Sequence, residues 1–78
     1  MRRRKGYHHG DLRHALVEAA LKLVAEKGVQ GLTLRETARR VGVSQAAPYR
    51  HFADKKELLL AVGEAGFRAA SELISYVR

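Results

Sequence analysis

The sequence predicts an all-α fold, with a three-helix domain followed by the start of a long fourth helix. Apolar residues recur at intervals of three and four along most of the chain, which is the spacing of one helical face. No stretch alternates apolar and polar residues in the way that strands do. Capping residues and glycines divide the helical pattern into separate segments.

Composition limits the class of protein. The chain has 78 residues, enough for one small domain, and it lacks the cysteines that a disulfide or a cysteine-based zinc site would need. No apolar run approaches the roughly 18 residues that span a bilayer, and the N-terminus lacks the apolar segment of a signal peptide. We therefore expect a soluble, cytoplasmic protein without a membrane partner.

The net charge of +7 is concentrated in two segments. Residues 1–5 contain four basic residues and no acidic one, and residues 35–56 contain six basic residues against two acidic ones. Residues 1–10 show no apolar periodicity, so we expect them to form a mobile basic arm. Two basic segments on a short chain are typical of a surface for a polyanion, although composition alone leaves DNA, RNA and an anionic membrane open.

The first helix is predicted over residues 11–27. Its apolar stripe runs from Leu12 to Val24, and Asp11 places a carboxylate where the positive end of the helix dipole favours it. Gly28 fits the left-handed position just past a helix end, with Val29 as its apolar follower.

The second and third helices are predicted to be short. Thr33 and Glu36 have the spacing of a capping box that opens the second helix, and Gly42 ends this helix after about two turns. Ser44 is expected to cap a third helix that runs to about His51 or Phe52.

A second capping box, Asp54-Lys55-Lys56-Glu57, opens the fourth helix, whose apolar positions run from Leu58 through Phe67 to Val77. We expect the domain to occupy residues 11–70. Residues 71–78 are expected to lie beyond the domain, on the continuation of the fourth helix.

Residues 33–52 have the layout of a helix-turn-helix, with two short helices joined by Gly42-Val43-Ser44. Ala38 is small where the two helix backbones approach each other, and Val43 is expected to pack from the turn into the core. An ordinary helical hairpin that binds no ligand shares this layout, so the motif alone leaves both interpretations open.

The outer side of the third helix favours the DNA-binding interpretation. Gln45 can form paired hydrogen bonds with an adenine edge, and the methyl groups of Ala46 and Ala47 can contact thymine methyls. The residues that follow carry donors suited to phosphate oxygens, and Thr33 can hold a phosphate at a helix start. The candidate DNA-binding residues are Thr33, Arg35, Ser44, Gln45, Ala46, Ala47, Tyr49, Arg50, His51 and Lys55.

These motifs together resemble the TetR family of bacterial transcriptional regulators. The resemblance covers about residues 11–70 and depends on an ordered set: Leu32 to Ala38, Val41-Gly42-Val43-Ser44, Tyr49-Arg50-His51-Phe52, and Asp54 to Leu59. It implies that Gln45 and Ala46 face bases, whereas Thr33, Tyr49, His51 and Lys55 contact phosphates. It also implies a dimeric repressor of a palindromic operator. Residues 71–78 would begin the connection to a C-terminal regulatory domain, outside this sequence, that dimerises and binds a small-molecule effector.

Pro48 departs from the pattern of the family, which usually has leucine or another aliphatic residue before the tyrosine. Proline lacks the N–H donor and disfavours helical geometry at the preceding residue, here Ala47. Because Pro48 is only the fourth residue after the expected cap, we expect the third helix to survive.

Other interpretations are weaker. The histidines of Tyr7-His8-His9 and His14 are interpreted as solvated or phosphate-contacting, because adjacent histidines in a mobile arm lack the partners that orient metal ligands. No metal or cofactor is therefore expected. No motif places a catalytic partner beside His51, and an enzyme is not predicted. An RNA- or membrane-binding basic peptide would show sequence-independent affinity, whereas a protein-docking module would bind no DNA even at low salt.

Overall fold

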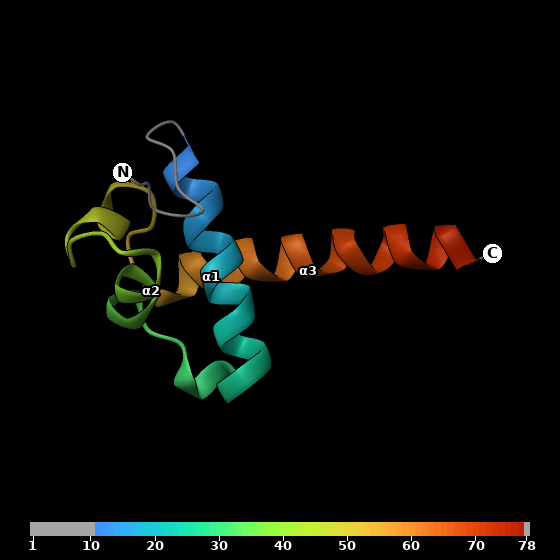
Figure 1. The fold of residues 1–78 in the computed structure, drawn as a ribbon, viewed down its shortest axis with the longest axis horizontal. Helices are drawn as coiled ribbons and strands as arrows, with labels where there is room; N and C mark the ends of the chain where they lie inside the picture. Colours follow the sequence, from blue (N-terminus) through green and yellow to red (C-terminus); the bar gives the residue numbers. More distant parts are fainter. Residues whose placement is uncertain (1–10, 78) are drawn as a thin grey trace, which may run out of the picture.

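The computed structural model describes the backbone of residues 11–77 and the side chains of residues 11–68. The predicted basic arm and the final residue lie outside this part of the chain. The described elements are all helical and follow the order α1 (Leu12–Lys27), η2 (Val29–Gly31), α2 (Leu34–Val41), η3 (Ala47–Arg50) and α3 (Lys55–Val77). The all-α prediction is confirmed (Figure 1).

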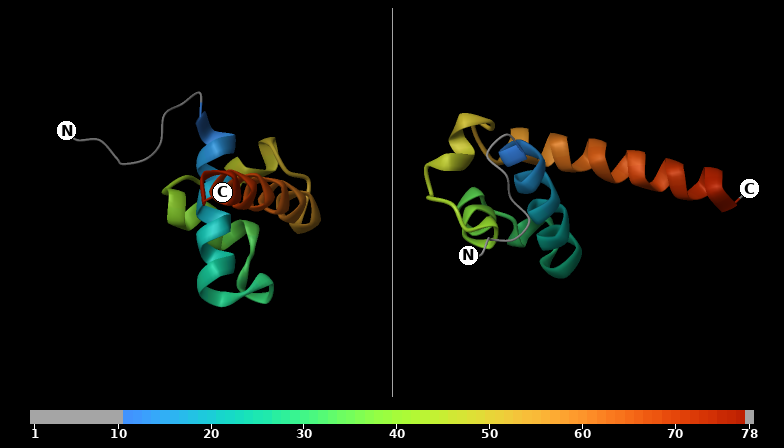
Figure 2. Two further views of the ribbon diagram at one scale, coloured as in Figure 1. Left: turned by 90° about the vertical axis from the view of Figure 1, so that its right-hand side faces the viewer. Right: turned by 45° about the horizontal axis from the view of Figure 1, so that its top comes forward.

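Helix α1 is the centre of the packing. It contacts η2, α2 and α3, and it crosses α3 at a steep angle (Figure 1 and Figure 2). Its inward face buries Leu16 and Leu23 completely, and these pack in one cluster with Leu32 and with Leu58 of α3. The predicted apolar stripe therefore forms the core, because it faces the rest of the domain along its whole length.

The segment between α1 and α2 differs in detail from the prediction. Gly28 has the expected positive φ of 80°, but its ψ of 172° is extended rather than left-handed helical. Its N–H still donates to the carbonyl of Val24 at 2.8 Å, which satisfies an orphan group at the helix end. Val29 was expected to follow the cap as an apolar contact, and it is instead half exposed at the start of η2.

Helix α2 begins and ends where the sequence predicts. The backbone N–H of Glu36 donates to Thr33 Oγ1 at 2.9 Å, and Gly42 takes the left-handed conformation with φ 92° and ψ 30°. Thr37 is fully buried, and its hydroxyl donates to the Thr33 carbonyl at 2.6 Å. This bond satisfies a buried polar group that would otherwise destabilise the domain.

The third α-helix that was predicted from Ser44 onward is absent from the described chain. A turn at Gln45 and Ala46 leads instead into the short 3-10 helix η3. An α-helix would need a bond from the N–H of residue 48 to the Ser44 carbonyl, and Pro48 has no N–H. The N–H of Ala47 takes that carbonyl at 3.1 Å, which tightens the chain into i to i+3 bonds.

If the missing N–H is the cause, Pro48→Leu should lengthen η3 into an α-helical turn. Pro48→Ala supplies the same N–H without the bulk of leucine, so it should produce the same change. Backbone NMR chemical shifts and protection of the residue-48 amide from hydrogen exchange would measure this. Persistence of the 3-10 pattern in both variants would contradict the explanation.

Helix α3 opens at the second predicted capping box, where the N–H of Glu57 donates to Asp54 Oδ1 at 3.0 Å. The Glu57 carboxylate in turn accepts from the N–H of Ala53 at 2.9 Å. Leu58 and Val62 are buried as expected, but Phe67 is largely exposed. The apolar periodicity of α3 therefore predicts more burial than the described part of the chain provides.

Candidate nucleic-acid interface

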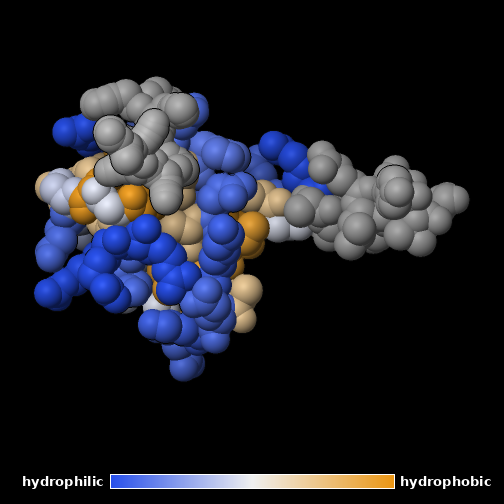
Figure 3. Space-filling view, viewed as in Figure 1, coloured by the Kyte–Doolittle hydropathy of each residue, from blue (hydrophilic) through white to orange (hydrophobic). Residues whose placement is uncertain are grey.

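The structure brings two of the predicted segments together in one groove. The groove has a volume of about 440 Å³ and lies between the first part of α2 and the turn that precedes η3. Its lining combines four candidate residues with three that were not proposed: Thr33, Arg35, Ser44 and Gln45, with Glu36, Arg39 and Val43. The most hydrophilic area on the face seen in Figure 3 lies over α2.

The turn presents some of its predicted residues and hides another. Ser44, Gln45 and Ala46 are exposed, so their side chains are available to a ligand. Ala47 is only 6% exposed and belongs to the core cluster, contrary to the expectation that its methyl group faces thymine. It anchors η3 beside Pro48, which is fully buried.

The remaining candidates extend from η3 to the start of α3. Tyr49 is 58% exposed, and Arg50 and His51 are also exposed, whereas Lys55 is half buried at the first turn of α3. None of these four side chains lines the groove that holds Gln45. The candidate interface thus has two parts, the groove and the exposed surface of η3.

Phe52 closes η3 against the core and also contacts α1. The guanidinium of Arg13 lies 5.3 Å from the centroid of its ring, within the range of a cation–π contact. No local sequence pattern predicts this contact, because Arg13 and Phe52 lie far apart in the sequence. It links the start of α1 to the buried residue that follows η3.

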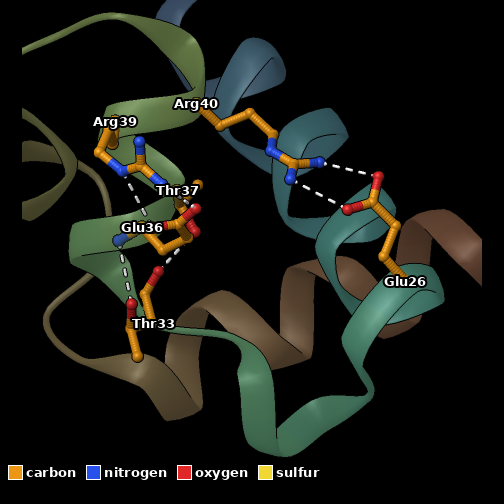
Figure 4. A network of polar contacts seen from close by, with 6 residues as sticks. All are labelled: Glu26, Thr33, Glu36, Thr37, Arg39 and Arg40. Carbon is orange, nitrogen blue, oxygen red and sulfur yellow. Dashed lines mark hydrogen bonds and ion pairs between the residues drawn. The ribbon is translucent and has the colours of Figure 1, made fainter.

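Two arginines of α2 pair with carboxylates (Figure 4). Arg39 donates to Glu36 with Nε–Oε1 and Nη2–Oε2 distances of 3.1 and 2.9 Å, and Arg40 donates to Glu26 of α1 with two bonds of 3.0 Å. The bonds that each carboxylate accepts hold its pKa below the usual value. The bonds that Arg40 donates to Glu26 also raise the pKa of Arg40. The i, i+3 spacing could have indicated the first pair, whereas the second joins separate helices.

Within residues 11–77, no helix is long and apolar enough to cross a membrane. Among the side chains that the structure describes, those of residues 11–68, no three or more His, Asp or Glu side chains form a cluster suited to a metal ion. Three histidines were considered as metal ligands in the sequence analysis. His14 Nε2 lies 3.6 Å from Glu18 Oε2 on the surface of α1, and His8 and His9 lie outside the described residues.

Helix α2, the left-handed glycine that ends it, the exposed polar turn and the short helix η3 together have the layout of a helix-turn-helix. Comparison with known proteins gives the family. The chain belongs to the tetR family of bacterial regulatory proteins, whose model matches residues 16–62. The motif-based resemblance is therefore confirmed. Members of this family are DNA-binding transcription regulators.

Individual relatives agree with this assignment. The chain is 50% identical over 52 residues to the tetracycline repressor protein class A from transposon 1721 of Escherichia coli, a match that covers 67% of this chain and 24% of that repressor. It is 43% identical over 49 residues to the HTH-type transcriptional regulator BetI of Rhizobium meliloti, which covers 63% of this chain and 24% of BetI.

A third relative is the HTH-type transcriptional repressor AcnR of Corynebacterium diphtheriae, 33% identical over 63 residues, or 81% of this chain and 33% of that repressor. The chain thus spans about a quarter to a third of the length of these curated relatives. No solved structure is significantly similar to it.

Proposed function

We propose that this chain is the DNA-binding part of a transcriptional repressor that binds a palindromic operator as a dimer. One observation carries the proposal: Gln45 is exposed on the turn and lines the same groove as Thr33 and Arg35. A group able to read a base edge therefore lies beside groups suited to phosphate, and a sequence-specific DNA contact needs both.

The roles of the candidate residues follow from their places in this arrangement. Gln45 and Ala46 contact bases from the exposed turn, with Ser44 beside them. Thr33 and Arg35 contact phosphates from the start of α2. On the second part of the interface, Tyr49, Arg50, His51 and Lys55 contact phosphates on the other side of the turn. Ala47 is left out of the proposal because it is buried.

The rest of the regulator is proposed from its relatives. The tetracycline repressor and AcnR are repressors by name, and each is about three to four times as long as the matched segment. We propose that α3 leads into a region that dimerises and binds a small-molecule effector. We also propose that the basic residues 2–5, outside the described chain, contact the DNA backbone or its minor groove.

Lys55→Ala is expected to weaken binding to every DNA sequence alike, because a phosphate contact fixes position without reading bases. The slope of log K against log salt should decrease in magnitude by about one. Titrations of a mixed-sequence duplex at several salt concentrations would measure the slope. Lys22→Ala removes the same charge from an exposed position of α1, and it should leave the slope unchanged.

If Lys55→Ala leaves the slope as it was, the proposed phosphate contact is wrong. Equal affinity of the unchanged protein for DNA, RNA and anionic vesicles would indicate a general polyanion binder. Failure to bind DNA even at low salt would indicate a protein-docking module, and either result would contradict the proposed function.

A further inference from the structure

The neighbouring arginines Arg39 and Arg40 make similar ion pairs in different surroundings. Each is held by a carboxylate through two hydrogen bonds, Arg39 by Glu36 and Arg40 by Glu26 (Figure 4). Glu36 and Arg39 line the groove that contains Gln45, whereas neither residue of the other pair does. One pair therefore lies within the proposed DNA-binding surface, and the other provides a matched comparison outside it.

Arg39 has the position and exposure of a phosphate ligand. Its side chain is 75% exposed, and it lies one helical turn beyond Arg35 on the same side of α2. A guanidinium binds carboxylate and phosphate oxygens with the same planar, two-pronged geometry. Among the described residues Arg35 forms no ion pair. Arg39 is therefore already bound by a carboxylate, whereas Arg35 is not.

The Glu36 carboxylate is more sheltered than its partner, with 22% of its side chain exposed. The bonds from Arg39 keep the pKa of this carboxyl below its usual value, so Glu36 is charged at neutral pH. A phosphate that binds Arg39 must displace these bonds or share the guanidinium with a nearby negative charge. Both arrangements cost free energy relative to an unpaired arginine.

We propose that Glu36 competes with DNA phosphate for Arg39 and so weakens the binding of DNA of every sequence. The inference rests on the proposed function, and it assigns the two residues opposite effects on the same surface. Because phosphate contacts read no bases, the competition lowers affinity without changing which sequence is preferred.

Glu36→Gln tests the competition. Glutamine keeps the backbone N–H that donates to Thr33 Oγ1, so the first turn of α2 is retained. We expect tighter binding to a mixed-sequence DNA duplex and a salt slope steeper by about 0.9, the value for one added phosphate contact. The advantage over the unchanged protein should shrink about 3.5-fold for each fourfold rise in salt. Fluorescence anisotropy of the full chain would measure both, with circular dichroism to check helix content.

Glu26→Gln is the matched control, because it changes the net charge equally and releases Arg40 outside the groove. It should leave the slope unchanged. Adding Arg39→Gln to the Glu36→Gln variant should remove the steepening. Equal steepening by both glutamate variants, or none in Glu36→Gln, would overturn the inference while DNA binding by the unchanged protein stands. Absence of DNA binding by the unchanged protein would overturn the proposed function and this inference together.

Discussion

Leu23→Ala is expected to destabilise the domain by about 3 to 5 kcal/mol, the range for a leucine removed from a close-packed core. Leu23 is fully buried in α1 and packs in the cluster that joins α1 to the rest of the domain. A chain of this size has roughly 4 to 12 kcal/mol of stability in total. The variant should therefore lose more than about 10 °C in Tm.

Thermal unfolding followed by circular dichroism would measure this loss in the full chain. Leu60→Ala makes the same chemical change at a side chain that is 69% exposed, so it should shift Tm by little. Similar losses in both variants would show that the cluster around Leu23 is not the core of this domain.

Gln45→Ala is expected to have the largest effect on sequence preference. A side chain that pairs with an adenine edge through two hydrogen bonds contributes about 1 to 3 kcal/mol of discrimination, or roughly 5- to 150-fold. Alanine keeps the exposed turn but removes both hydrogen-bonding groups. Preference should relax at one symmetric pair of positions in sites selected from a random pool, while affinity for mixed-sequence DNA stays nearly constant.

Gln30→Ala is the matched control, since Gln30 is also exposed but lies in η2, outside the groove. It should select the same sites as the unchanged protein. If Gln45→Ala selects those sites too, with unchanged affinity, Gln45 makes no base contact and the proposed reading of the operator is wrong.

The elements that have local signals could be predicted from the sequence. Thr33 satisfies a free N–H at the start of α2, and Gly42 takes a conformation that costs other residues free energy, so each marks a helix boundary by itself. The prediction of a third α-helix was wrong. One missing N–H, at Pro48, decides between an α-helix and a 3-10 helix, and the apolar pattern of the sequence is compatible with both.

The same error explains the place of Ala47. Ala47 is the first residue of η3 and follows a tight turn instead of an α-helical turn, so the face assigned to it from α-helical spacing is misplaced. The groove was predicted only in part. Thr33, Arg35, Ser44 and Gln45 were proposed from their residue types, but their shared groove depends on how the turn after Gly42 folds back on α2.

The central position of α1 has a consequence for the order in which the domain forms during synthesis. A ribosome makes α1 before the elements that cover it, yet a helix in a protein gains most of its stability from tertiary packing. Its stabilising partners include Leu58 and Val62, which are translated more than 30 residues after α1 is complete. The nascent chain therefore keeps part of an apolar stripe exposed until the start of α3 has left the ribosome, and this exposed surface is the kind that chaperones bind.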